Sequence, residues 1–223
     1  MKIVHKLMGA LALVLFSTSL VSAQDLSKYR NFSLGMHLAG LSKQVNASPA
    51  EIIVTHQSPA VIQELTWWPP PSSQSTAPSE PVQEILFSFY NGTLYKIAVM
   101  YEGSATEGLT AADMVRAISA KYGAATLPIA GTTPPAPSYG SPGETVALWQ
   151  DSQYLLTLSR APLSKAFQFV MLSKQMNAQA ELAIAQVVAQ ERKDAPQKEA
   201  ARVKKDADDL ETQRQNNLKT FRP

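Results

Sequence analysis

One stretch constrains the fold more than any other: a strand–turn–strand pattern from Glu84 to Tyr101 that leads into a capped helix. Aromatic and β-branched residues dominate both arms, as they do in half-buried strands. Asn91-Gly92 stands between the arms and is a strong signal for a tight turn. The pattern therefore predicts a β-hairpin.

Burial decides between two registers of this hairpin. A two-residue loop pairs Phe87 with Lys96 and places that lysine on the apolar face. A three-residue loop from Tyr90 to Gly92 pairs Phe87 with Tyr95 instead. Ser88 and Lys96 then fall together on the other face. We expect this second register, in which Lys96→Ala is nearly silent, as for a surface residue. It gathers these side chains on one face: Ile85, Phe87, Phe89, Tyr95, Ile97 and Val99.

The helix after the hairpin has signals at both ends. Thr110 can accept a hydrogen bond from the first turn, and Asp113 lies three residues on, which is a capping box with Asp in place of Glu. Gly123 is placed to end the helix. Its inner side follows helical spacing: Met114, Val115, Ile118 and Tyr122.

Further elements flank this unit and complete the expected domain. A short helix is predicted at 37–45, with Asn46 as a left-handed residue after it. Strands are predicted at 51–55, 61–68, 145–150, 154–159 and 167–172. The fold expected for residues 24–173 is α+β: an antiparallel sheet from two degenerate αβ-type units, about 31–101 and 102–173, with helices on one face.

The first residues have the pattern of a secretory signal peptide, residues 1–23. Lys2 and Lys6 precede a mostly apolar run from Leu7 to Leu20, and Val21-Ser22-Ala23 offers small residues for cleavage. The run is short for a bilayer span of about 20 residues. We therefore expect cleavage near Ala23, before Gln24, rather than a membrane anchor.

Charge and cysteine content narrow the possible partners and compartments. Removal of Lys2 and Lys6 leaves 18 basic and 18 acidic residues, so nucleic acid is not an expected partner. The chain has no cysteine, which excludes a cysteine-linked lipid anchor, disulfides and thiolate catalysis. No transmembrane span is expected in the mature chain. Secreted eukaryotic domains usually carry disulfides, so a bacterial periplasmic or extracellular protein is expected.

The last segment, 174–223, differs in composition from the domain before it. It holds 18 of the 36 charges of the mature chain in 50 residues, and strong helix formers dominate it. Pro196 is expected to end or kink the helix. Beyond it, Ala200, Val203, Ala207 and Leu210 make a thin seam at 3,4,3 spacing. This pattern predicts a charged, solvated helical extension that can bind a partner.

Two proline-rich segments, Pro69 to Pro81 and Pro128 to Pro142, are expected to be solvated loops. The step from Trp67 to Pro71 could instead form an aromatic and polyproline contact surface. The candidate partner-binding residues of the whole chain are Trp67, Trp68, Pro69, Pro70, Leu182 and Val187.

A search for chemistry finds no catalytic, cofactor-binding or metal-binding constellation. His37 and His56 have no second ligand at a zinc-site spacing. No nucleophile elbow, phosphate-binding glycine loop or dinucleotide fingerprint is present. We expect no cofactor. A catalytic site assembled from distant residues stays open.

Several motifs carry a resemblance to known families. Leu34-Gly35-Met36 with Leu41 resembles the entry motif of the SmpA/OmlA outer-membrane-assembly lipoproteins and of the β-lactamase-inhibitor-protein-like fold. That family has a short helical segment followed by an antiparallel meander, and Phe89 to Tyr95 suits its strands. The chain departs from it in lacking the lipid-anchor cysteine and in having Asn46 where Gly is usual.

A second resemblance covers most of the mature chain. It is to an uncharacterised secreted bacterial family of the acidobacterial type, and it implies no activity. It is carried by Tyr29-Arg-Asn-Phe, Ile62-Gln-Glu-Leu-Thr-Trp, Thr106-Glu-Gly-Leu-Thr and Phe221-Arg-Pro.

Two functions from different classes remain. The first is a non-catalytic periplasmic binding or scaffolding protein whose partner is another cell-envelope protein. The second is an envelope hydrolase whose site is built from non-contiguous residues. A polar pocket with a histidine and a carboxylate favours the enzyme, and a flat apolar patch favours the binding protein.

Overall fold

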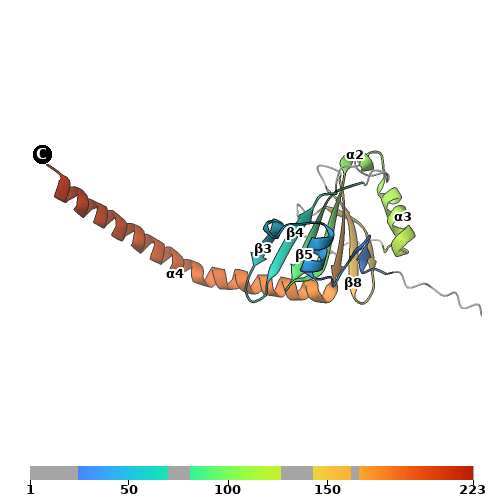
Figure 1. Cartoon of the computed structure of the whole chain (residues 1–223), viewed down its shortest axis with the longest axis horizontal. Helices are drawn as coiled ribbons and strands as arrows, with labels where there is room; N and C mark the ends of the chain where they lie inside the picture. The colour runs from blue at the N-terminus through green and yellow to red at the C-terminus, as the bar shows by residue number, and fades with distance from the viewer. Residues whose placement is uncertain (1–24, 70–80, 127–142, 162–165, 223) are drawn as a thin grey trace, which may run out of the picture.

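A computed structural model describes residues 25–69, 81–126, 143–161 and 166–222 of the chain. The expected signal peptide, Pro70 and nearly all of both proline-rich segments lie outside the described residues. Within them the α+β fold is confirmed: one large antiparallel sheet, helices, and a long C-terminal helix (Figure 1).

Seven strands form the sheet, in the order β3-β4-β5-β6-β9-β8-β7, and all neighbours are antiparallel. The chain makes one meander from β3 to β6 and a second from β7 to β9, and the β6–β9 pairing joins them. The division into two repeated units stays an interpretation. The strands are β3 (Ile52–His56), β4 (Ile62–Trp67), β5 (Val82–Tyr90), β6 (Thr93–Tyr101), β7 (Glu144–Gln150), β8 (Tyr154–Arg160) and β9 (Phe167–Ser173).

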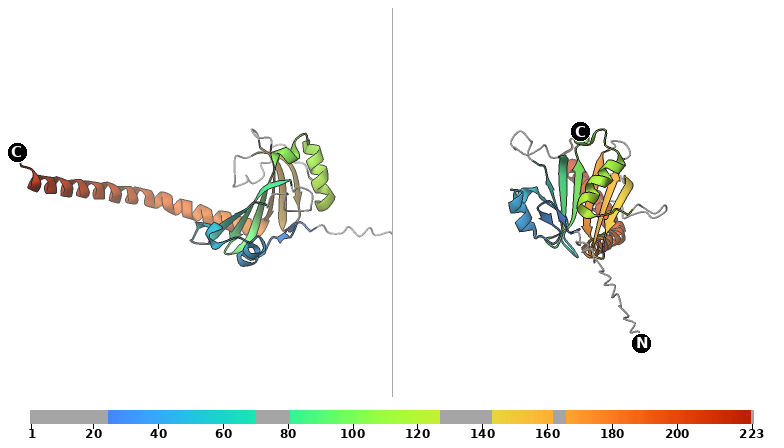
Figure 2. Two further views of the ribbon diagram at one scale, coloured as in Figure 1. Left: turned by 45° about the horizontal axis from the view of Figure 1, so that its top comes forward. Right: turned by 90° about the vertical axis from the view of Figure 1, so that its right-hand side faces the viewer.

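The helices cover the two faces of the sheet differently. On one face lie a two-stranded hairpin, β1 (Lys28–Tyr29) with β2 (Phe32–Ser33), and the helices α1 (Leu38–Gln44) and α3 (Ala111–Tyr122). The first turns of α4 (Lys174–Thr220) pack on the other face, and the rest projects away (Figure 2). Two short elements, η1 (Pro49–Glu51) and α2 (Gly103–Thr106), complete the fold.

The main core lies between the sheet and the α1/α3 side. Phe87 is fully buried there, with its ring 4.8 Å from that of Phe32 in an edge-on arrangement. At the other end of the core, Trp149 packs edge-on against Phe169 and donates a hydrogen bond from Nε1 to the Gly123 carbonyl oxygen at 2.9 Å. Aromatic pairs of this kind stabilise a core beyond their buried area.

The hairpin turn differs from the three-residue loop expected from the sequence, which is wrong. Tyr90 pairs with Thr93, so the loop is Asn91-Gly92 alone, with φ of 47° and 76°. Asn and Gly both tolerate the left-handed backbone, and such a loop matches the twist of the strands.

A bulge one step further in restores the pattern of faces. Phe89 pairs with Leu94 and Ser88 pairs with Lys96, so Tyr95 is the extra residue. The main core therefore takes Leu94 rather than Tyr95. The expectation that Ser88 and Lys96 share the other face is confirmed. Lys96 is nevertheless buried, with 5% of its surface exposed, so its expected surface position is wrong.

The capped helix α3 matches its sequence signals. The Asp113 N–H donates to Thr110 Oγ1 at 3.2 Å, and the Thr110 N–H donates to Asp113 Oδ2 at 3.0 Å. Gly123 follows the last turn with a φ of 85°, a left-handed value. Asn46 likewise has a φ of 56° after α1. Both helix ends are therefore fixed by local residues.

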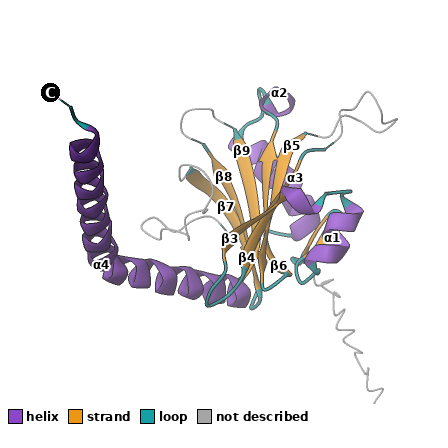
Figure 3. Ribbon diagram, turned by 60° about the vertical axis from the view of Figure 1, so that its left-hand side comes forward, coloured by secondary structure: helices purple, strands orange, loops and turns teal. Residues whose placement is uncertain are grey.

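The last helix does not stop at Pro196. α4 runs unbroken from Lys174 to Thr220 and is bent along its length (Figure 3). A proline removes one backbone hydrogen bond and crowds the preceding turn, which bends a helix without ending it where neighbouring residues favour helix. Of the two outcomes expected at Pro196, the structure has continuation with a bend.

Candidate functional site

α4 first crosses the sheet and then leaves it. Its residues Met176, Ala180 and Ile184 pack with Ile62 of β4 and Tyr95 of β6. This spacing of four keeps one side of the helix against the sheet. The contact forms a second, smaller core on the face opposite α1 and α3.

Buried polar groups lie beneath this part of α4. Ser88 and Lys96 are directly opposite each other on β5 and β6 and are 0% and 5% exposed. The Lys96 ammonium lies 5.8 Å from the centre of the Tyr95 ring. The carboxylates of Glu64 and Glu181 both act on it electrostatically. We call these five residues the polar cluster.

Burial determines the acid–base properties of the polar cluster. It lowers the pKa of Lys96, against the opposing effect of Glu64 and Glu181. It also raises the pKa of Tyr95 to about 12, and the same carboxylates add to that shift. The Ser88 hydroxyl is close enough to lower the pKa of Tyr95 slightly. However, Ser88 Oγ has no partner at hydrogen-bond geometry in the described part of the chain.

A cavity of about 390 Å³ lies on the opposite face, between the sheet, α3 and the β1–β2 hairpin. Most of its wall is apolar. We call it the tyrosine pocket, and the residues that define it are Tyr29, Arg30, Tyr101, Ala117, Lys121 and Tyr122.

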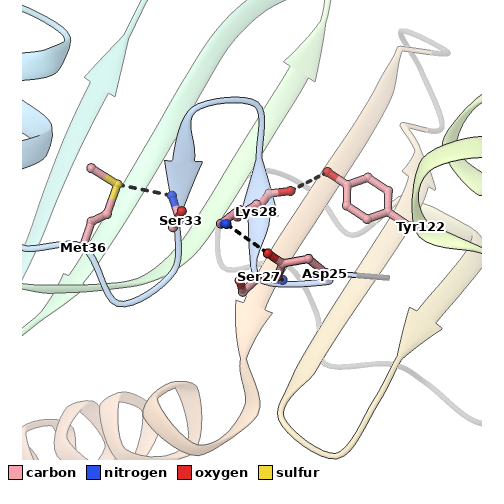
Figure 4. A network of polar contacts seen from close by, with 6 residues as sticks. All are labelled: Asp25, Ser27, Lys28, Ser33, Met36 and Tyr122. Carbon is pink, nitrogen blue, oxygen red and sulfur yellow. Dashed lines mark hydrogen bonds and ion pairs between the residues drawn. The ribbon is translucent and has the colours of Figure 1, made fainter. Parts of the chain in front are cut away.

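Hydrogen bonds and ring contacts fix the tyrosines of this pocket. Tyr122 on α3 donates from its hydroxyl to the Lys28 carbonyl oxygen at 2.8 Å, which ties α3 to β1 (Figure 4). The Tyr101 hydroxyl is hydrogen-bonded to Tyr29. The Tyr29 and Tyr122 rings lie 6.1 and 5.7 Å from the ring of Phe169. The pocket wall is therefore built from four separate elements.

The N-terminal segment beside the pocket is held by local polar contacts. Asp25 forms an ion pair with Lys28 at 3.2 Å and accepts a hydrogen bond from the Ser27 N–H at 3.0 Å (Figure 4). The Ser33 N–H donates to the sulfur of Met36 at 3.2 Å. These contacts fix the hairpin that carries Tyr29.

Two cations stand at the tyrosine pocket. The Arg30 guanidinium lies 5.3 Å from the centre of the Tyr29 ring, and the Lys121 ammonium lies 5.9 Å from the same centre. Burial lowers the pKa of Lys121, Arg30 lowers it further, and Asp25 raises it. Burial also raises the pKa values of Tyr101 and Tyr122. All three tyrosines are therefore neutral at pH 7.

A second cavity, of about 520 Å³, lies at the loop between α2 and α3. Its wall includes Glu107, Thr110 and Arg160, and most of it is backbone and small side chains. Neither of these two cavities, as the described residues form them, contains a histidine. The described residues also hold no group of three His, Cys, Asp or Glu able to bind a metal.

The structure separates the residues predicted to form a partner-binding surface. Trp67 is half-buried and its ring packs 5.8 Å from that of Phe32, whereas Trp68 is 60% exposed. Both lie at the end of β4 opposite Ile62, which α4 contacts. Pro69 follows them and is half-buried.

The two predicted residues of α4 face different ways. Leu182 is 65% exposed, and Val187 is half-buried near the point where the helix leaves the sheet. The tryptophans and α4 therefore do not form one continuous surface.

No protein-family model, no curated protein and no solved structure matches the chain. The family resemblances seen in the sequence thus stay predictions. Within the described ranges, none of the helices combines the length and apolar character that a membrane-spanning helix requires.

Sequence reasoning missed the tyrosine pocket, because its members are far apart in the chain. Tyr29, Tyr101 and Tyr122 belong to β1, β6 and α3, and each also fits the pattern of an ordinary core position. The nearest signal was Tyr122 at the end of the apolar stripe of α3. Nothing in that stripe indicated a cavity.

Proposed function

We propose that this protein is a non-catalytic binding protein of the bacterial cell envelope that uses its C-terminal helix to engage another envelope protein. One observation carries the proposal: every residue from Ala195 to Arg222 is exposed, although the helix is continuous with the part that packs on the sheet. We call residues 195–222 the arm. At about 1.5 Å per residue, its helical part extends about 40 Å beyond the domain.

The arm can stay helical without packing on the domain. Arg202 is ion-paired with Glu199 at 2.7 Å and with Asp206 at 3.0 Å, and Arg214 is ion-paired with Glu211 at 2.6 Å. These pairs lie three or four residues apart, the spacing that supports an isolated helix. The partner therefore meets a surface that is already helical, which lowers the entropy lost on binding.

An apolar stripe on the arm is the proposed contact. Val203 and Leu210 are 54% and 67% exposed, and Ala200 and Ala207 lie between them on the same side of the helix. Charged residues flank the stripe. Such a stripe suits a partner with an apolar groove that accepts one side of a helix.

Site-specific photo-crosslinking in envelope fractions tests the proposal. A photoreactive residue at Val203 or Leu210 should give one crosslinked product, because both face the partner. The same residue at Thr212, on the opposite side of the helix, is the matched control and should give little. Leu210→Glu should remove the product formed at Val203, whereas Thr212→Glu should leave it. Equal products at all three positions, or none at any, would reject the arm as a recognition surface.

The alternative, an envelope hydrolase, has one feature in its favour. Ser88 and Lys96 bring a hydroxyl and an amine together on neighbouring strands. Both are buried on the face that α4 crosses, so a substrate could reach them only if α4 moved. Hydrolysis of an ester substrate that is lost in Ser88→Ala and retained when the arm is deleted would favour this alternative.

A further inference from the structure

The tyrosine pocket has the size and wall of a small-molecule site. Its volume of about 390 Å³ falls within the range of about 300–1,000 Å³ typical of such sites. Its wall is mostly apolar and comes from β1, β6, α2, α3 and β9, so the pocket is formed only in the folded domain. It lies on the face opposite α4 and does not involve the arm.

The hydroxyl groups of the pocket are engaged within the protein. Tyr122 donates to the Lys28 carbonyl oxygen, and Tyr101 is hydrogen-bonded to Tyr29. These bonds satisfy the polar ends of the rings and present their carbon surfaces to the cavity. An apolar group is therefore the suitable occupant of the pocket body.

The charges of the pocket determine the sign of its ligand. Three tyrosines around a cavity resemble the aromatic cages that bind quaternary ammonium groups. Here, however, Arg30 and Lys121 line the same cavity and would repel a second cation. Lys121 lies over the Tyr29 and Tyr122 rings, at 5.9 and 5.1 Å from their centres, and forms no ion pair in the described part of the chain. An anionic group beside it would relieve the repulsion between the two cations.

We propose that the tyrosine pocket binds a small amphipathic carboxylate, with its apolar body against the aromatic rings and its carboxylate between Arg30 and Lys121. The guanidinium can hold a carboxylate through two parallel hydrogen bonds, and the ammonium supplies a further charge-assisted bond. The class includes medium-chain fatty acids.

Calorimetric titration of the purified protein with decanoate, below its micelle concentration, tests the proposal. Decan-1-ol and decyltrimethylammonium have the same alkyl body with a neutral and a cationic head. Decanoate should bind at least about tenfold more tightly than decan-1-ol, since a charge-assisted bond is worth that much. The ammonium compound should not bind measurably. Equal affinity for the three compounds, or preference for the ammonium compound, would overturn the proposal.

Variants locate the site. Lys121→Gln should weaken decanoate binding about tenfold, and Lys121→Arg should restore it, because only the charge is needed. Lys43→Gln, an exposed change on α1 outside the pocket, is the matched control. Ala117→Trp should block binding by filling the cavity. Lys121 is exposed, so its variants are expected to fold, and a Lys121→Gln protein that binds like the wild type contradicts the assignment.

The proposal is independent of the function proposed for the arm. Deletion of 197–223 should leave decanoate affinity unchanged, because the pocket lies on the other face of the sheet. Loss of affinity on this deletion would show that the pocket described here is not the binding site.

Discussion

Ser88 and Lys96 face each other across β5 and β6 in the interior of the protein, on the face that α4 crosses. A lysine is rarely this buried unless it is paired. Its two nearest carboxylates, on Glu64 and Glu181, act from beyond ion-pair distance, so the ammonium is only partly compensated.

Substitution of Lys96 by a side chain of similar length without charge should stabilise the protein. We expect Lys96→Met to raise the free energy of unfolding at pH 7 by about 1–2 kcal/mol, since it removes an imperfectly paired buried charge. Lys96→Ala should be about 2–4 kcal/mol less stable than Lys96→Met, because it leaves a cavity. Urea unfolding measures both. A methionine variant less stable than the wild type would mean that the carboxylates fully compensate the ammonium.

The same position predicts a dependence on pH. Burial lowers the pKa of Lys96 below its ordinary 10.5, so the unfolded chain binds more protons between the two values. Wild-type stability from this group therefore rises as pH increases through that window. The advantage of Lys96→Met should shrink from pH 7 towards pH 10. Tyr95 is present in both proteins, so its own titration largely cancels in the comparison.

Phe87 should be among the most sensitive positions of the main core. Its ring is fully buried against Phe32. Phe87→Ala should lower the free energy of unfolding by about 3–5 kcal/mol. The control is Phe221→Ala, where the ring is 73% exposed and the change should stay within about 0.5 kcal/mol. Similar effects at both positions would contradict the burial described here.

The cap of α3 gives a prediction with an acid-sensitive part. Thr110→Ala removes the side-chain acceptor of the Asp113 N–H and should cost about 1 kcal/mol, whereas Thr110→Ser should be nearly neutral. Hydrogen bonds from Thr110 hold the pKa of Asp113 below its usual range. The contribution of the box is therefore present above the ordinary carboxyl pKa and is lost as pH falls through the lowered one. Thermal unfolding at pH 7 and pH 3 should show a smaller effect of Thr110→Ala at pH 3.

Two truncations should separate the arm from the domain. Removal of 197–223 deletes only exposed residues, so the melting temperature should hardly change. Removal from Met176 onward uncovers Ile62, Tyr95 and Lys96 and should lower it clearly. Circular dichroism on both proteins makes the comparison. If the short truncation unfolds the protein, the arm belongs to the core.

Export is testable by N-terminal sequencing. The basic start, the apolar run and the small residues before Gln24 predict a mature protein that begins at Gln24. It should be released by osmotic shock of the producing bacterium. Recovery of a chain that still starts at Met1, in the membrane fraction, would contradict the prediction.

Local signals predicted most of the fold, and contacts between distant segments account for the rest. The Thr110/Asp113 box and the Asn91-Gly92 turn depend on adjacent residues, so they could be read from the sequence. The bulge at Tyr95 could not, because it depends on which side chains meet β9 and α4. Lys96 was assigned to the surface since nothing near it in sequence shows that α4 returns to cover that face.

The candidate sites were less predictable than the fold. The exposed arm followed from its charge density and its thin apolar seam. The tyrosine pocket arises only when β1, β6 and α3 converge, and a tyrosine that lines a cavity has the same local pattern as one in a core. Trp67 and Trp68 were grouped because they are adjacent, but adjacent strand residues point to opposite faces.

The pairing of β6 with β9 also sets the order in which the chain can fold during synthesis. The paired residues, such as Lys96 with Leu172, are roughly seventy positions apart. The first meander therefore emerges from the ribosome with the β6 edge open and apolar, and it stays so until β9 has been made. An open edge of this kind is prone to pair with other chains. The nascent protein thus depends on rapid completion of its second half, or on a chaperone that shields β6, although the finished sheet keeps that strand at its centre.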